Sequence, residues 1–202
     1  VIQAAAETSL RNGTGAEEVM ATLAAISPIA PSLVMTYWNP IEKYGVEKFL
    51  DDLKSNGGSG VITPDLTIEE SERWIAASTE RETNRVYVVA PSTSPERLRS
   101  VCIATSGFIY AASLMGVTGT RTSISSNAES LVARLRQVTQ LPIAVGLGVS
   151  TPEQVREVAQ YADGVIVGSA FIRLLQESQS LEEGIARVRE LAQNLSKGLQ
   201  RP

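Results

Sequence analysis

The sequence contains no histidine and only one cysteine, Cys102, in 202 residues. Without histidine the chain lacks the side chain that most often serves as a general base, and also the commonest zinc ligand. Any acid–base chemistry must therefore use carboxylates, tyrosine or lysine. A lone cysteine excludes a disulfide or a cysteine-based metal site within one chain. Cys102 lies in a helical pattern, which predicts a small buried side chain rather than a reactive thiol.

Long apolar segments and runs of basic residues are also missing, although 43% of the residues are hydrophobic. No stretch approaches the roughly 20 apolar residues that cross a bilayer. The formal net charge is −4, and a mildly acidic chain without clustered Lys or Arg disfavours nucleic acid and anionic membranes as partners. We therefore expect a cytoplasmic protein in which residues 1–202 form a single domain.

Strand-like and helical segments alternate along the chain. Short apolar runs rich in β-branched residues predict strands at 33–38, 60–65, 85–91, 108–113, 142–145 and 165–167. A repeated strand–helix unit implies a parallel α/β sheet covered by helices. A (β/α)8 TIM barrel usually needs about 250 residues, so this chain would hold about six of its eight βα units. We expect such a barrel, with one or two further units upstream of Val1; a doubly wound six-stranded sheet is the alternative.

The sequence also predicts the limits of several elements. Residues 41–56 have the pattern of one helix, 128–139 that of another, and Trp38 falls in a predicted strand. The polar segment 114–127 is longer than most connections in such folds, which is typical of lids and binding loops. The capping-box spacing at helix starts occurs at Thr67 with Glu70 and at Thr93 with Glu96.

Two glycine turns within residues 141–172 have the same construction. Gly146 and Gly148 follow one predicted strand, and Gly168 with Ser169 follows the next. Free N–H groups at a helix start bind phosphate well because the helix dipole favours negative charge there, and glycine leaves room for close approach. Barrels often bind phosphate in the loops after their last two strands. The two turns therefore predict a phosphate site, and the alternative is that these glycines only close tight turns.

Several segments resemble the tryptophan synthase alpha subunit, in the same order and at the same spacing over essentially the whole chain. They are MTYWNPIEKYGVEKF, GVITPDLTIEES, VAPSTSPERL, IYAASLMGVTGTR, GLGVSTPEQV and ADGVIVGSA. The last segment is shared by several phosphate-binding barrels, whereas YWNPI combined with YAAS and GVTG is specific to this family. Other phosphate-binding barrels, such as indole-glycerol-phosphate synthase or thiamine-phosphate synthase, are disfavoured because the YWNPI and GVTG segments are not theirs.

The resemblance implies a fold, a reaction and a partner. The family is a (β/α)8 barrel that cleaves indole-3-glycerol phosphate into indole and glyceraldehyde 3-phosphate by a retro-aldol reaction. It passes indole to a beta subunit that carries pyridoxal phosphate, in an α2β2 tetramer, and it has no cofactor or metal of its own. The alternative is a non-catalytic partial barrel that binds phosphate and only docks on the beta subunit.

The resemblance also implies residue roles. Residues at the substrate phosphate are Gly119, Gly146, Gly148, Gly168 and Ser169. Residues of the substrate pocket are Tyr110 at the glycerol phosphate, and Tyr37, Pro64 and Val88 near the indole. Candidates for docking on the beta subunit are Asn39, Pro40, Leu66 and Thr67, and the alternative is that they form ordinary loop surface.

The two carboxylates that perform the chemistry in the family, a Glu and an Asp, are expected upstream of Val1. Within residues 1–202, Asp65 follows a predicted strand. It either supports the lid through Thr118 or is a turn residue that accepts backbone hydrogen bonds. Tyr37 and Tyr110 are expected to be pocket walls, because an ordinary tyrosine pKa near 10 suits neither acid nor base at neutral pH.

Thr118 provides the first test. If its loop closes over the substrate and excludes water, Thr118→Val should lower the turnover number much more than it alters folding, because it removes the hydroxyl while keeping the shape. Steady-state assays of the full-length protein, with thermal unfolding as the control, measure both effects. Equal turnover in the variant would exclude the lid role.

Overall fold

A six-stranded parallel sheet forms the centre of the computed structural model, which describes residues 1–113, 121–146 and 148–199, with the backbone alone for 121–126. Each strand pairs with the next one in the sequence. A doubly wound sheet reverses its strand order, so that alternative is wrong. The strands are β1 (Leu33–Met35), β2 (Gly60–Thr63), β3 (Asn84–Val89), β4 (Ile109–Ala112), β5 (Ile143–Gly146) and β6 (Gly164–Ile166).

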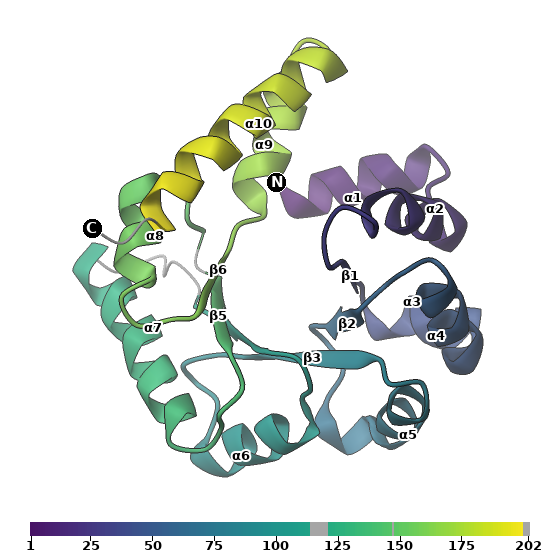
Figure 1. Ribbon diagram of the computed structural model, residues 1–202, viewed down its shortest axis with the longest axis vertical. Helices are drawn as coiled ribbons and strands as arrows, with labels where there is room; N and C mark the ends of the chain where they lie inside the picture. Colours follow the sequence, from purple (N-terminus) through teal and green to yellow (C-terminus); the bar gives the residue numbers. More distant parts are fainter. Residues whose placement is uncertain (114–120, 147, 200–202) are drawn as a thin grey trace.

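Helices surround the sheet on its outer side, and the strands follow one another around a common centre (Figure 1). They are α1 (Ile2–Arg11), α2 (Ala16–Ile26), α3 (Trp38–Tyr44), α4 (Val46–Ser55), α5 (Glu72–Glu80), α6 (Pro95–Ala104), α7 (Arg121–Arg136), α8 (Pro152–Val158), α9 (Ser169–Glu177) and α10 (Leu181–Ser196), with 3-10 turns η1 (Ile68–Glu70) and η2 (Lys197–Leu199). Within the described ranges, none of these helices has the length and apolar character needed to cross a membrane.

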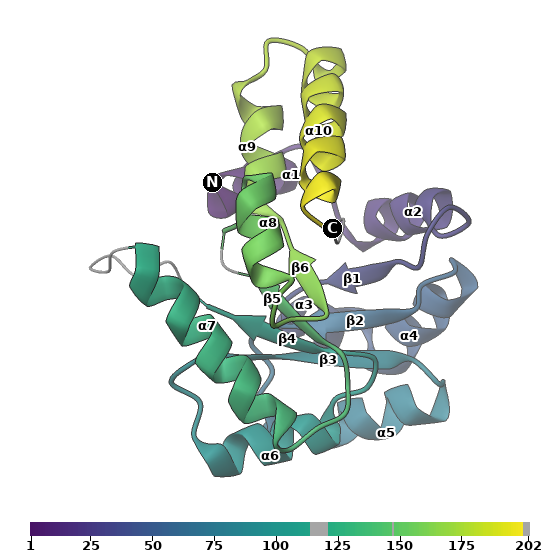
Figure 2. The same ribbon diagram turned by 60° about the vertical axis from the view of Figure 1, so that its left-hand side comes forward.

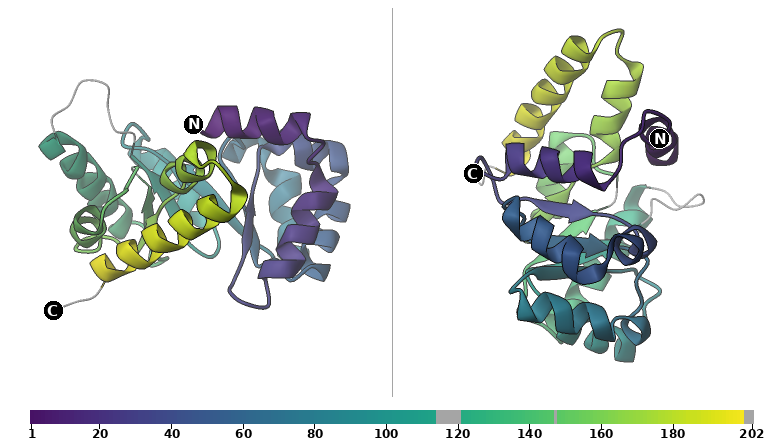
Figure 3. Two further views of the ribbon diagram at one scale, coloured as in Figure 1. Left: turned by 90° about the horizontal axis from the view of Figure 1, so that it is seen from above. Right: turned by 90° about the vertical axis from the view of Figure 1, so that its right-hand side faces the viewer.

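The two ends of the sheet lie apart and are linked by helices. Helices α9 and α10 pack side by side and project beyond the sheet (Figure 2). Helix α1 packs against α9 and precedes α2, which contacts β1 (Figure 3). In the described part of the chain β1 and β6 do not pair with each other, so the curled sheet is not closed by its own strands.

The two faces of the sheet differ in burial. On the outer face the register row of Val89, Ala111 and Val145 is buried beneath the helices. The neighbouring inner row of Val88, Tyr110 and Ala144 is only half-buried. Parallel sheets are normally covered on both faces. Here the outer face forms the core, and this inner row is left partly accessible at the centre of the curl.

The single helix predicted at 41–56 is two helices in the structure. Helix α3 ends at Tyr44 and α4 begins at Val46, because Gly45 between them has φ of +96°. Glycine enters this region at little cost, whereas other residues avoid it. Trp38, expected in a strand, is instead the first residue of α3. Its ring meets the fully buried Trp74 edge-on, with centroids 5.6 Å apart.

Other predicted limits also need correction. Ser94, not Thr93, caps α6, and its Oγ accepts from the N–H of Arg97 at 3.3 Å. Thr67 Oγ1 donates to Glu70 at 3.0 Å beside the short turn η1 rather than at the start of α5. Helix α7 begins seven residues before the expected position, at Arg121. The prediction for Cys102 is confirmed, since this side chain is buried in α6 and its burial raises the thiol pKa.

Asp163 links the amino-terminal ends of β5 and β6 to the carboxyl end of α7. Its carboxylate accepts from the N–H of Ile143 at 2.7 Å and from Arg136 of α7 at 2.5 Å, just before β6. The hydrogen bond from Ile143, supported by Arg136, holds the pKa of Asp163 below its ordinary 3.8. A lowered pKa in the folded state means that the unfolded chain binds the proton more tightly. The carboxylate therefore stabilises the fold above pH 3.8, and this contribution is lost as the pH falls further.

Asp163→Asn should accordingly lower the free energy of unfolding by about 1 kcal/mol at pH 7, and the difference from wild type should shrink at pH 3. Urea unfolding at the two pH values measures it. Glu157→Gln is the control, because Glu157 is an exposed carboxylate on α8. An equal loss at both pH values would show that the charge of Asp163 does not matter.

Candidate functional site

The carboxyl ends of the parallel strands meet at one rim. The predicted site residues in the described ranges follow these ends or lie within the strands close to them. Barrel enzymes build their sites at this rim. Tyr37 follows β1, Pro64 and Asp65 follow β2, and Gly168 follows β6. Thr118 and Gly119 lie outside the described residues. The rim therefore brings together segments that are distant in sequence.

Tyr110 and Gly146 are in direct contact. A methyl group on Gly146 would lie 2.7 Å from the phenol oxygen of Tyr110 and 2.8 Å from its ring, so only glycine leaves room for this ring. Val88 pairs with Tyr110 in the same inner row. Burial raises the pKa of Tyr110 above its ordinary 10. The phenol is therefore protonated at neutral pH and forms a wall of the site rather than a base.

The start of α9 is open. Gly168 is its N-cap residue, Ser169 is its first helical residue, and no described side chain caps it. Among the described residues, no atom lies within 4 Å of the position that a Cβ of Gly168 would occupy. The first N–H groups of a helix have no acceptor within the helix, and the dipole gives them a partial positive charge. This helix start can therefore bind an anion with backbone groups alone.

The start of α8 is capped by side chains, although this helix also follows a glycine turn in the sequence. Thr151 Oγ1 accepts from the N–H of Gln154 at 3.3 Å. In return, Gln154 Oε1 accepts from the N–H groups of Ser150 at 2.8 Å and Thr151 at 3.1 Å. The glycine turn after β5 thus offers Gly146 and the exposed Gly148, with φ of +76°, but not the amides of Ser150 and Thr151. The Thr–x–x–Gln spacing was a visible signal for this capping box.

Asp65 does not act as an isolated rim carboxylate. Its Oδ1 and Oδ2 lie 3.0 and 3.1 Å from the backbone nitrogen of Trp38, which donates to them. This is the role of a turn residue that accepts backbone N–H groups, although the donor is 27 residues away in sequence. The side chain of Tyr37, which precedes Trp38, is 66% exposed.

Comparison with known proteins gives the family. The family model for the tryptophan synthase alpha chain matches residues 1–200. The tryptophan synthase alpha chain of Thermobifida fusca is 50% identical over 98% of this chain and 75% of its own length. That of Acidothermus cellulolyticus is 48% identical over 100% of this chain and 75% of its own. The chain belongs to the tryptophan synthase alpha chain family.

Solved structures of this family have the same fold. Tryptophan synthase from M. tuberculosis, in an aminoacrylate- and BRD0059-bound form, matches with a TM-score of 0.89 at 42% identity, covering 100% of this chain and 74% of that one. The A-subunit from Pyrococcus furiosus matches with a TM-score of 0.85 at 29% identity, covering 96% and 79%. The expected α/β barrel architecture is thereby confirmed, with six of its parallel strands in the part of the chain that the structure describes.

The docking residues expected from the tryptophan synthase alpha family fall into two groups. Asn39 and Pro40 are exposed in the first turns of α3, and Thr67 is half-buried. Leu66 is only 6% exposed and packs in the core of this chain. Its apolar side chain turns inward after β2, so the expectation that Leu66 docks on a partner was wrong.

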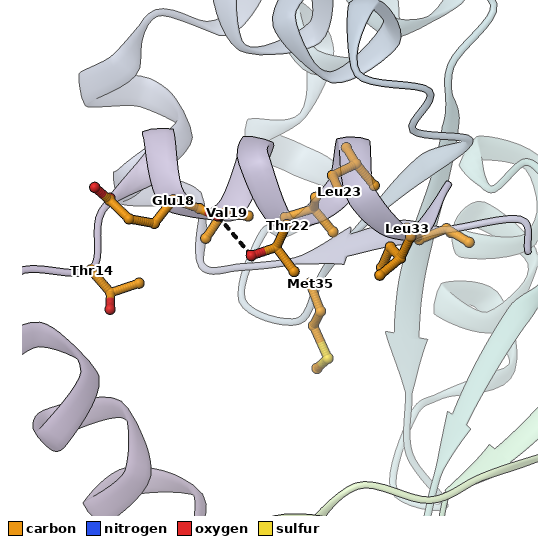
Figure 4. A pocket seen from close by; sticks show the side chains of 9 residues that line it. Thr14, Glu18, Val19, Thr22, Leu23, Leu33 and Met35 are labelled. Carbon is orange, nitrogen blue, oxygen red and sulfur yellow. Dashed lines mark hydrogen bonds between the residues drawn. The ribbon is translucent and has the colours of Figure 1, made fainter. Parts of the chain in front are cut away.

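Two hollows are lined by none of the residues predicted for the site of this family member. One of about 400 Å³ lies between α2 and β1 and is lined by residues such as Val19, Leu23 and Met35 (Figure 4). The other, of about 360 Å³, lies where α9 and α10 meet the start of α8, and Arg173 and Arg187 line it. Within the described ranges no three His, Cys, Asp or Glu side chains gather where they could hold a metal ion.

The contact between Tyr110 and Gly146 can be tested by stability. Gly146→Ala should lower the free energy of unfolding by about 1–3 kcal/mol, because the added methyl group overpacks the site. Tyr110→Leu in the same chain should remove much of this cost, so the double variant should be more stable than the sum of the single effects. Urea unfolding of the four proteins measures the coupling, with Gly168→Ala as a control that meets no neighbour. Additive effects would show that the two residues do not interact.

Proposed function

We propose that this protein is a lyase that cleaves indole-3-glycerol phosphate to indole and glyceraldehyde 3-phosphate in tryptophan biosynthesis. The observation that carries this proposal is the open start of α9, located at the same rim as the contact between Tyr110 and Gly146. Membership of the tryptophan synthase alpha chain family supports the reaction.

The phosphate would bind to backbone N–H groups at the α9 start, beside Gly168 and Ser169. Gly146 and Gly148 would leave room for the phosphate on the side of β5, and Gly119 would complete the site. No Lys or Arg side chain is part of this set. Binding would therefore rest on N–H donors and the helix dipole, which together suffice for phosphate in many proteins.

The rest of the substrate would lie along the inner face of the sheet. Tyr110 would border the glycerol phosphate, while Tyr37, Pro64 and Val88 would border the indole. Their strands, β1 to β3, lie at the opposite end of the sheet from β6. An extended substrate with a phosphate at one end and an aromatic ring at the other matches this order.

The reaction breaks the bond between the indole ring carbon and the glycerol chain. The ring carbon keeps the electron pair and takes a proton from an acid, while a base removes the proton of the glycerol hydroxyl as its carbonyl forms. Carboxylates can serve both roles. We assign them to the Glu and Asp of the family, and the described residues would bind and orient the substrate.

We further propose that the protein works with a beta subunit, in an α2β2 tetramer, and that pyridoxal phosphate belongs to that subunit alone. The matching structures from M. tuberculosis are of tryptophan synthase, which supports such a partner. Asn39 and Pro40, exposed on α3 at the rim, and the half-buried Thr67 after β2 are the docking residues that remain available.

Gly168→Val tests the phosphate site. The new side chain should meet no neighbour at its Cβ and should fill the space in front of the α9 start, so KM for indole-3-glycerol phosphate should rise on the order of tenfold or more while stability stays near wild type. Indole release by the full-length protein measures KM. Gly15→Val is the matched control, because Gly15 is the extended N-cap glycine of α2. An unchanged KM in Gly168→Val would refute phosphate binding at α9.

A further inference from the structure

Helix α3 begins without a cap of its own. Its N-cap residue is Tyr37, whose side chain makes no capping hydrogen bond. The first N–H groups of a helix need an acceptor, and a nearby carboxylate is favoured there by the helix dipole. In this structure the acceptor comes from another strand unit, because both oxygens of Asp65 accept from Trp38 N–H at 3.0 and 3.1 Å.

This bond is one of two that enclose Tyr37. On the preceding side, the N–H of Thr36 donates to the carbonyl of Ile62 in β2 at 3.1 Å. On the following side, the N–H of Trp38 donates to Asp65, three residues beyond Ile62. The backbone of Tyr37 is therefore attached to β2 and its loop on both sides. Its side chain stays 66% exposed at the rim.

The ring of Trp38 supplies a separate, apolar attachment. It packs edge-on against Trp74, which is fully buried in α5. Helix α3 therefore has packing that does not involve Asp65, whose own side chain is exposed. Removing the carboxylate should consequently loosen the start of α3 without unfolding the chain.

We propose that Asp65 is a positioning residue that fixes Tyr37 at the aromatic end of the substrate site by capping α3 from the neighbouring strand. This inference rests on the proposed function, in which Tyr37 borders the indole. Asp65 would therefore affect only one end of the substrate, because the phosphate end is bound by α9 at the far end of the sheet. Loss of Asp65 should weaken binding of the indole ring and leave the phosphate end unaffected.

The test compares two ligands in the full-length protein. Asp65→Ala should raise KM for indole-3-glycerol phosphate on the order of tenfold, the loss expected for one charge-assisted hydrogen bond. The inhibition constant of glyceraldehyde 3-phosphate, which has no indole, should stay at the wild-type value. Asp65→Asn keeps an oxygen that can accept from Trp38 and should restore most of the affinity. Asp163→Asn, which removes a carboxylate from a backbone N–H at the opposite end of the strands, should leave both constants unchanged.

A double variant shows whether Asp65 acts through Tyr37. If it does, Asp65→Ala combined with Tyr37→Ala should bind the substrate no worse than Tyr37→Ala alone. Independent, multiplying effects, or an equal loss of affinity for both ligands, would overturn the inference while the proposed function stands. A wild-type protein that neither cleaves indole-3-glycerol phosphate nor binds glyceraldehyde 3-phosphate would overturn both.

Discussion

Burial of the outer face of the sheet sets the position of every group at the rim. Val89, Ala111 and Val145 lie in one register row beneath the helices, and side chains alternate along a strand. The next row, with Tyr110, must therefore face the centre. A slip of one residue would turn Tyr110 into the core and bring a buried apolar side chain to the inner face. Because the strands have only three to six residues, the rim lies one or two residues beyond this row.

Capping determines which helix starts remain able to bind a ligand. Helices α8 and α9 both follow glycine turns at the rim. The amides near α8 are used by Thr151 and Gln154, whereas the start of α9 has only Gly168 before it. A missing cap usually costs about 1 kcal/mol of stability. The start of α9 lacks such a cap, and a bound anion could take its place. This is the physical reason for assigning the phosphate to α9 rather than α8.

Local patterns predicted much of the fold but not its long-range contacts. The β-branched runs identified all six strands to within a few residues, because buried parallel strands are short and apolar. The break at Gly45 was missed, since the neighbouring residues continue a helical pattern and only the positive φ ends the helix. The bond between Asp65 and Trp38 joins residues 27 apart, so no local pattern could reveal it. Leu66 was misjudged for the same reason, because its burial depends on the core that it packs against.

The lack of histidine fits the way this rim is built. At the aromatic end, α3 is held by a carboxylate from the neighbouring strand and by packing between Trp38 and Trp74. At the other end, the groups proposed to hold the phosphate are backbone amides and glycines, and Tyr110 between them has a pKa raised by burial. The amides carry no titrating charge, and the raised pKa of Tyr110 keeps its phenol neutral between about pH 5 and pH 8, the range in which histidine titrates. The groups proposed to hold the phosphate can thus keep one charge state across that range, so a pH dependence of phosphate binding near neutrality would come from the phosphate itself.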